Sequence, residues 1–156
     1  MILVTGATGV LGSALMEHAG TVAYNRRLEA DHDITETYSA AILCAGSKGF
    51  HDCDGDENAF RADVDGNIRL IRALLRNKVF VVFISTEAVE RIGHRAAYSS
   101  NRLLVEQYLW GQENNAIVRP GRFDANNVGD IATFCLDIAH NKKQGIHRWY
   151  ERLTRA

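Results

Sequence analysis

The chain has 156 residues, a length that suits a single domain (1–156) able to bury about two thirds of the surface that its unfolded chain exposes. Hydrophobic residues make up 46% and charged residues 24%, and the formal net charge of -1 gives no field that would gather nucleic acid or anionic lipid. The N-terminal apolar run stops at Gly6, too short for a signal peptide, and no later run approaches the roughly 18 apolar residues that span a bilayer, so we expect a cytoplasmic protein without membrane or nucleic-acid partners.

An apolar run followed by three regularly spaced glycines opens the chain. Residues 2–4 predict a buried strand, and a helix is expected near 10–18. Gly6 permits a tight turn, Gly9 lets the backbone approach a pyrophosphate, and Gly12 lets the helix pack closely on the strand. The first amides of that helix and the positive end of its dipole face the anion. The segment therefore predicts a dinucleotide phosphate site.

Strands and helices alternate through the rest of the chain. Apolar runs predict strands at 21–24, 31–34, 40–45, 79–84 and 116–118, and an edge strand around 146–150. Apolar residues at steps of three and four predict a helix over 57–76, a second over 97–110 that is ended by Gly111, and a third that begins near Asp130.

This alternation implies right-handed crossovers and a parallel sheet covered on both faces. We therefore expect an α/β fold with a doubly wound parallel sheet, a Rossmann-like three-layer α/β/α sandwich with strand order 3-2-1-4-5-6. In such sheets ligands bind outside the carboxyl ends of the strands where the strand order reverses. The glycines of the first turn occupy that point.

The cysteines and one acidic run bear on metal binding. Cys44, Cys53 and Cys135 are an odd number without metal-ligand spacing, and we interpret them as reduced core residues. The run FHDCDGD at 50–56 admits a metal site, but Asp54 with Glu57 three residues later favours an acidic loop that caps the next helix. We predict no metal.

The spacing GxxGxxG with Thr5 in front resembles the short-chain dehydrogenase/reductase superfamily, in particular its extended and atypical branches. The resemblance implies a nicotinamide dinucleotide as cofactor. It implies a phosphate site made by Thr5, Gly6, Thr8, Gly9, Val10, Leu11 and Gly12. It further implies contacts to adenosine from Asp33, Ile34, Cys44, Ala45 and Gly46, and a cofactor contact from Pro120 in an RPG turn.

The residues after the second strand decide which dinucleotide is favoured. An NAD site normally places a carboxylate there for the ribose 2'-hydroxyl, whereas this chain offers Asn25, Arg26 and Arg27. An arginine pairs with a 2'-phosphate and stacks on adenine. We therefore predict NADP(H), with NAD(H) as the alternative cofactor and a merely solvated basic loop as the alternative interpretation.

The resemblance also implies catalytic positions. Tyr98 is followed four residues later by Arg102, where the family has YxxxK, and the match continues through Glu106. A tyrosine phenol titrates at about 10, so a cation one helical turn away must stabilise its phenolate. Thr86, with Ser85 as its neighbouring candidate, matches the hydroxyl that binds the reacting oxygen. Asp63 replaces the asparagine of the NVxG motif, and Arg102 cannot relay a proton as lysine can.

The chain lengths between these motifs are short for the family. Thr86 and Tyr98 stand 12 residues apart, and Asp130 follows the RPG turn almost at once, so most of the substrate-binding region is absent. Three functions stay open: a minimal NADP-dependent oxidoreductase for a carbonyl or hydroxyl substrate, a non-catalytic NAD(P)-binding module or redox sensor, and an interaction scaffold. The resemblance also implies a homodimer through helices 57–76 and 97–110, with Leu70, Tyr108 and Trp110 as apolar contacts.

Overall fold

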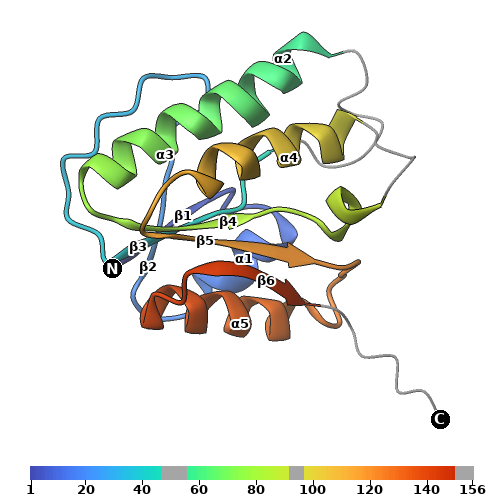
Figure 1. The fold of residues 1–156 in the computed structure, drawn as a ribbon. Helices are drawn as coiled ribbons and strands as arrows, with labels where there is room; N and C mark the ends of the chain where they lie inside the picture. Colours follow the sequence, from blue (N-terminus) through green and yellow to red (C-terminus); the bar gives the residue numbers. More distant parts are fainter. Residues whose placement is uncertain (47–55, 92–96, 150–156) are drawn as a thin grey trace.

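The fold is a single sheet of six parallel strands with helices on both faces (Figure 1). The computed structural model describes residues 1–46, 56–91 and 97–149. The strand order is β2-β1-β3-β4-β5-β6. The strands are β1 (Ile2–Thr5), β2 (Thr21–Ala23), β3 (Ala40–Leu43), β4 (Phe80–Ile84), β5 (Asn115–Pro120) and β6 (Gly145–Trp149).

Helices cover the two faces in separate groups. One face carries α1 (Val10–Met16) and α5 (Val128–Asn141), and the other carries α4 (Ala97–Trp110) beside a long helix built from α2 (Glu57–Phe60), the π-helix η1 (Arg61–Gly66) and α3 (Asn67–Arg76) (Figure 1). A short 3-10 helix, η2 (Glu87–Glu90), follows β4. The predicted doubly wound three-layer architecture is confirmed. The strand order reverses at β1, between β2 and β3.

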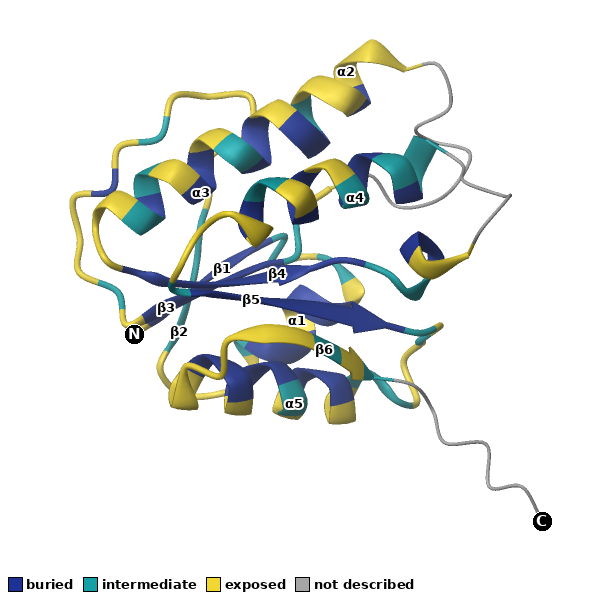
Figure 2. Cartoon of the chain, in the orientation of Figure 1, coloured by how far each residue is buried: buried dark blue, intermediate teal, exposed yellow. Residues whose placement is uncertain are grey.

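The core consists of two clusters separated by the sheet. All five residues of β4 are buried, because alternate side chains enter opposite clusters (Figure 2). Val82 packs with Leu15 and Ile131 on the side of α1 and α5. Phe83 packs with Leu70 on the side of α3 and α4. Both layers of helices are therefore held to the sheet by apolar contacts.

Residues 31–34 form no strand, so the edge strand predicted there is wrong and the sheet ends at β2. The loop instead turns its apolar side chains, Leu28 and Ile34, into the cluster beneath α3. Gly66 permits this approach, because a Cβ at that position would lie 2.5 Å from the Leu28 carbonyl oxygen. His32 holds the loop through Tyr24, with 2.7 Å from the phenol oxygen to Nδ1.

The other predicted elements form with small changes at their ends. The helix over 57–76 is continuous, the helix over 97–110 has the predicted bounds, and the edge strand around 146–150 forms as β6. The first helix ends at Met16, two residues early, because the next amides make tighter bonds to carbonyls three residues back. Asp56 caps α2 by accepting a hydrogen bond from the Asn58 amide, whereas Asp54 lies outside the described residues.

Two further predictions concern the cysteines, expected to be reduced core residues, and the expected lack of a membrane-spanning segment. Cys135 is a buried free thiol, as predicted, and Cys44 is a half-buried one; Cys53 and most of the acidic run at 50–56 lie outside the described residues. In the ranges that the structure describes, no helix has both the length and the apolar character needed to cross a bilayer.

Candidate functional site

The glycine turn after β1 has the geometry that its sequence predicts. Gly6 has a φ of +67°, and a Cβ there would lie 2.9 Å from the amide nitrogen of Ala45. A Cβ at Gly12 would lie 1.9 Å from the Gly6 carbonyl oxygen, so α1 packs directly on the turn. At Gly9 the nearest atom to such a Cβ is 3.4 Å away, again the Gly6 carbonyl oxygen. Two glycines therefore serve close packing, and the third leaves open backbone at the end of the sheet.

Beside this turn, the carboxyl ends of the neighbouring strands β1 and β3 lie next to each other. Thr5 is buried, and its hydroxyl oxygen accepts a hydrogen bond of 3.1 Å from the Ala45 amide, which ties the ends of the two strands together. No side chain caps the N-terminus of α1 at Gly9. The Leu11 side chain points into the core, whereas Thr8 and Val10 are exposed. Of these predicted contacts, Thr5 and Leu11 have no side chain available to a ligand.

The loop after β2 exposes the basic residues predicted to select the dinucleotide. Asn25, Arg26 and Arg27 are all exposed, and Nη1 of Arg26 donates a 3.0 Å hydrogen bond to the Asp31 carbonyl. Burial lowers the pKa of His32 in the same loop, against an opposing effect of the hydrogen bond to its backbone partner. A neutral imidazole is thereby favoured in the loop that carries the two arginines.

Of the two predicted adenine contacts in this loop, Asp33 is exposed and Ile34 is buried in the core cluster beneath α3. The carboxylate of Asp33 is thus reachable by a ligand, while the Ile34 side chain is committed to packing.

Tyr98 and Arg102 lie together on α4, one turn apart. The guanidinium carbon of Arg102 is 5.2 Å from the centroid of the Tyr98 ring and 5.7 Å from that of Phe83 on β4. Both distances are typical of cation–π contacts. A Cβ at Gly46 would lie 2.7 Å from Nη2 of Arg102, so the guanidinium rests against the backbone that follows β3. The predicted pair therefore lies beside the same segment after β3 that the glycine turn contacts through Ala45.

Arg102 is buried, with 6% of its surface exposed, and Nη1 has no hydrogen-bond partner. An unsatisfied charged donor is costly in a protein interior, and an oxygen atom of a ligand would relieve that cost. The nearby thiol of Cys44 supplies no anion at neutral pH, because burial raises its pKa to about 12 despite the opposing charge of Arg102. Open backbone at Gly9 and a donor without a partner at Arg102 fit a dinucleotide bound at this end of the sheet.

Thr86 lies where β4 ends and caps η2. Its hydroxyl oxygen accepts a 3.2 Å hydrogen bond from the Ala88 amide, which leaves the hydroxyl proton for another acceptor. Ser85, the neighbouring candidate, is buried and donates a 2.5 Å hydrogen bond to Oε2 of Glu106. Between the two hydroxyls, the half-buried one of Thr86 is therefore the one suited to a ligand.

Asp63 and Pro120 complete the predicted positions. Asp63 is 4% exposed on η1, which packs on α4, and it makes contacts of its own. The Asn67 side-chain amide donates a hydrogen bond of 2.8 Å to the backbone carbonyl of Asp63. The wider turn of a π-helix often marks a functional site. Pro120 is buried at the last position of β5, at the carboxyl edge of the sheet.

A buried ion-pair network behind Tyr98 and Arg102 escaped the sequence reasoning. Glu106 has no exposed surface, and its carboxylate accepts from Arg119 on β5, with 2.6 Å between Nη2 and Oε1. Nη1 of Arg119 bonds Glu90 on η2 at 2.8 Å, and Glu90 also accepts from Arg148 on β6. Burial opposes the charge of Arg119, but hydrogen bonds to both acids raise its pKa overall. The sequence offered only an acid beside apolar residues in the helix 97–110 and an arginine directly after the predicted strand 116–118.

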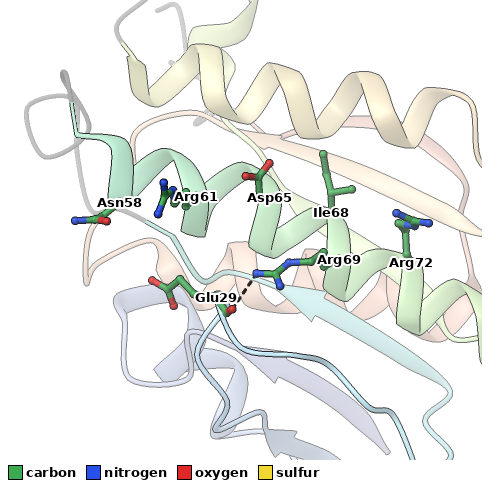
Figure 3. A pocket seen from close by; sticks show the side chains of 7 residues that line it. All are labelled: Glu29, Asn58, Arg61, Asp65, Ile68, Arg69 and Arg72. Atoms are coloured by element: carbon green, nitrogen blue, oxygen red, sulfur yellow. Dashed lines mark hydrogen bonds between the residues drawn. The ribbon is translucent and has the colours of Figure 1, made fainter.

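A separate polar pocket of about 730 Å³ lies between the loop after β2 and the outer face of the long helix. Figure 3 shows Arg69 reaching across it to the Glu29 carbonyl, a 2.9 Å hydrogen bond. The lining residues are Glu29, Asn58, Arg61, Asp65, Ile68, Arg69 and Arg72. None of the predicted catalytic or cofactor residues lines this pocket, so we do not assign the reaction to it.

No family model matches the chain, and no curated protein is similar to it in sequence. Solved structures do share its fold. A dTDP-4-dehydrorhamnose reductase from Clostridium acetobutylicum has a TM-score of 0.80 at 17% identity, over 94% of this chain and 72% of that one. A short-chain dehydrogenase/reductase from Vibrio parahaemolyticus has a TM-score of 0.69 at 16% identity, over 97% and 100% of the two chains.

The structure of RMD from Pseudomonas aeruginosa, complexed with NADPH, has a TM-score of 0.63 at 19% identity, over 78% of this chain and 52% of that one. These likenesses show that the chain shares the Rossmann-like α/β fold of these proteins.

Proposed function

We propose that this protein is an NADP(H)-dependent oxidoreductase that acts on a carbonyl or hydroxyl substrate. The observation that carries the proposal is the packing of Tyr98 against Arg102, with the Arg102 guanidinium resting on Gly46, next to the Ala45 backbone that the glycine turn contacts. The proposed proton-transfer residue and the proposed phosphate-binding turn thus lie at one edge of the sheet, where ligands of doubly wound folds bind.

Each residue of the site has a role that its geometry supports. A bound nicotinamide supplies or accepts the hydride. Tyr98 gives a proton to the substrate oxygen in reduction and takes it back in oxidation, and the adjacent Arg102 cation stabilises the phenolate left behind. Thr86 donates its hydroxyl proton to the same oxygen, because the Ala88 amide already occupies one of its lone pairs. Asp63 is buried on η1, which packs on α4.

NADP(H) rather than NAD(H) is the proposed cofactor. Arg26 and Arg27 are exposed directly after β2, and no acidic residue stands between them and the end of the strand. A 2'-phosphate is attracted by two guanidinium groups and would be repelled by a carboxylate at the same place. The NADPH bound to the similar RMD structure is compatible with this choice.

A non-catalytic NAD(P)-binding module or redox sensor is the second candidate, and one observation favours it. Arg102 stands where the family has lysine, and its guanidinium is wedged between two aromatic rings against the backbone of Gly46. A guanidinium does not release a proton, so it cannot pass one onward from Tyr98. Such a protein would bind the dinucleotide tightly without converting a carbonyl or hydroxyl substrate.

The test combines cofactor titration with turnover. Fluorescence titrations with NADPH and NADH should show binding of both, tighter for NADPH, and Arg26→Ala with Arg27→Ala should remove the difference. Oxidation of NADPH in a panel of carbonyl compounds should be lost in Tyr98→Phe, while cofactor affinity stays unchanged. Turnover that survives in Tyr98→Phe would refute its role, and binding without turnover for any carbonyl would select the sensor.

We also propose that the protein forms a homodimer through the face of the long helix and α4. Leu70 cannot contribute, because it is completely buried in the core, and its predicted contact is wrong. The apolar side chains left exposed on these helices are Phe60, Leu104 and Trp110, with Tyr108 half-buried beside them. Light scattering at micromolar concentration should give twice the monomer mass, and Trp110→Glu should return it to the monomer value.

A further inference from the structure

Arg102 carries a buried charge for which the described residues supply no counter-ion. Only 6% of the residue's surface is exposed, and it takes part in none of the ion pairs among residues 1–46, 56–91 and 97–149. Its contacts are instead the faces of Tyr98 and Phe83. By contrast, Arg119, the other buried arginine, is bound by two carboxylates.

This uncompensated charge borders the place where the proposed reaction occurs. Tyr98 and a dihydronicotinamide must serve the same substrate carbon and oxygen, so the nicotinamide ring and the Tyr98 side chain approach one another when the site is loaded. Arg102 contacts that side chain and the backbone of Gly46. The positive charge is therefore close to the ring of any dinucleotide that binds beside Tyr98 in a reactive position.

We propose that Arg102 makes the site selective for the redox state of its cofactor, so that the protein binds NADPH more tightly than NADP+. The inference rests on the proposed cofactor site and adds to it. The two redox forms share the adenosine, the phosphates and both riboses, and they differ by one positive charge on the nicotinamide ring. The fixed charge of Arg102 repels that ring charge and leaves the neutral reduced ring unaffected.

The size of the effect follows from the separation of the charges. Two like charges within about 10 Å of each other in a protein weaken binding on the order of tenfold at an effective dielectric constant near 20. An arginine stays charged at every physiological pH, so the repulsion does not depend on pH in this range. Selective binding of the reduced form suits a reductase that must release its oxidised cofactor.

The test is the ratio of two dissociation constants, measured without any substrate. NADPH is titrated by its fluorescence, and NADP+ is titrated by displacement of bound NADPH at pH 7. Because contacts to the shared parts of the cofactor cancel in the ratio, only the charge on the ring remains. The wild-type protein should bind NADPH at least about tenfold more tightly than NADP+.

Three variants separate charge from shape. Arg102→Lys keeps the charge and should keep the wild-type ratio, whereas Arg102→Gln and Arg102→Met remove it and should bring the ratio below about threefold. Arg72→Gln, an exposed arginine on α3, is the control and should leave the ratio unchanged. Circular dichroism establishes that each variant is folded, and the wild-type ratio tests the proposal even where a variant does not fold.

Two kinds of failure are distinguishable. A wild-type protein that binds neither form refutes the proposed cofactor site itself. A wild-type ratio near one, an unchanged ratio in the neutral variants, or an equal loss in Arg102→Lys and Arg102→Gln overturns the selectivity while leaving the cofactor site in place.

Discussion

Replacement of Glu106 by glutamine should strongly destabilise the fold, although the two side chains have nearly the same shape. The carboxylate has no exposed surface and accepts hydrogen bonds from Ser85 and from both Nε and Nη2 of Arg119. A glutamine retains one acceptor oxygen, but its amide group would face an arginine donor. The change also removes the negative charge that balances Arg119 in the protein interior.

The expected loss is about 3–5 kcal/mol of unfolding free energy, the cost of removing one partner from a buried ion pair. Glu90 remains as a second partner for Arg119, at 2.8 Å from Nη1, and this places the loss toward the lower figure. In a domain of this length it corresponds to a decrease in Tm of about 10 °C. Urea unfolding followed by circular dichroism, at equal m-values, measures it.

Glu57→Gln is the matched control, because it makes the same chemical change in an exposed ion pair. Glu57 bonds Arg61 at 2.8 Å with side-chain exposures of 78% and 63%, so its loss should cost no more than about 0.5 kcal/mol. If the two variants unfold at the same urea concentration, the network of Glu106 does not stabilise the fold in the way argued here.

Three further predictions concern single features of the fold. Gly12→Ala should destabilise the protein by more than about 2 kcal/mol, because the added Cβ would lie 1.9 Å from a carbonyl oxygen. Gly129→Ala is the control: it has open space around it and should be neutral or slightly stabilising in urea unfolding. Equal unfolding midpoints for the two variants would contradict this. At pH 7, iodoacetamide should modify Cys44 and Cys135 far more slowly in the folded protein than in the unfolded chain, because burial raises both thiol pKa values. Mass spectrometry measures the two rates, and equal rates would show that the thiols are accessible. Burial lowers the pKa of His32, so the unfolded chain binds a proton on this imidazole more readily than the folded chain does. The free energy of unfolding should therefore fall as the pH drops below about 6.5. His32→Asn should flatten this part of the plot of urea midpoint against pH, and an unchanged slope would show that His32 does not cause it.

The sequence by itself determined the fold class and most element positions. The glycine spacing after the first strand requires a tight turn and a closely packed helix, and both are present at Gly6 and Gly12. The helical steps over 57–76 and the apolar run of β4 are local patterns that specify which faces are buried. These features depend on backbone sterics and on burial of neighbouring residues, which a linear pattern expresses directly.

Tertiary structure alone decided the sheet edge and the interior of the candidate site. Residues 31–34 form a loop because Gly66 admits the Leu28 carbonyl, a contact between segments 38 residues apart in the chain. The ion pair of Glu106 with Arg119 and the seat of Arg102 against Gly46 likewise join distant elements. Such contacts depend on how the helices are rotated and placed over the sheet, and no periodicity within either segment encodes that relation.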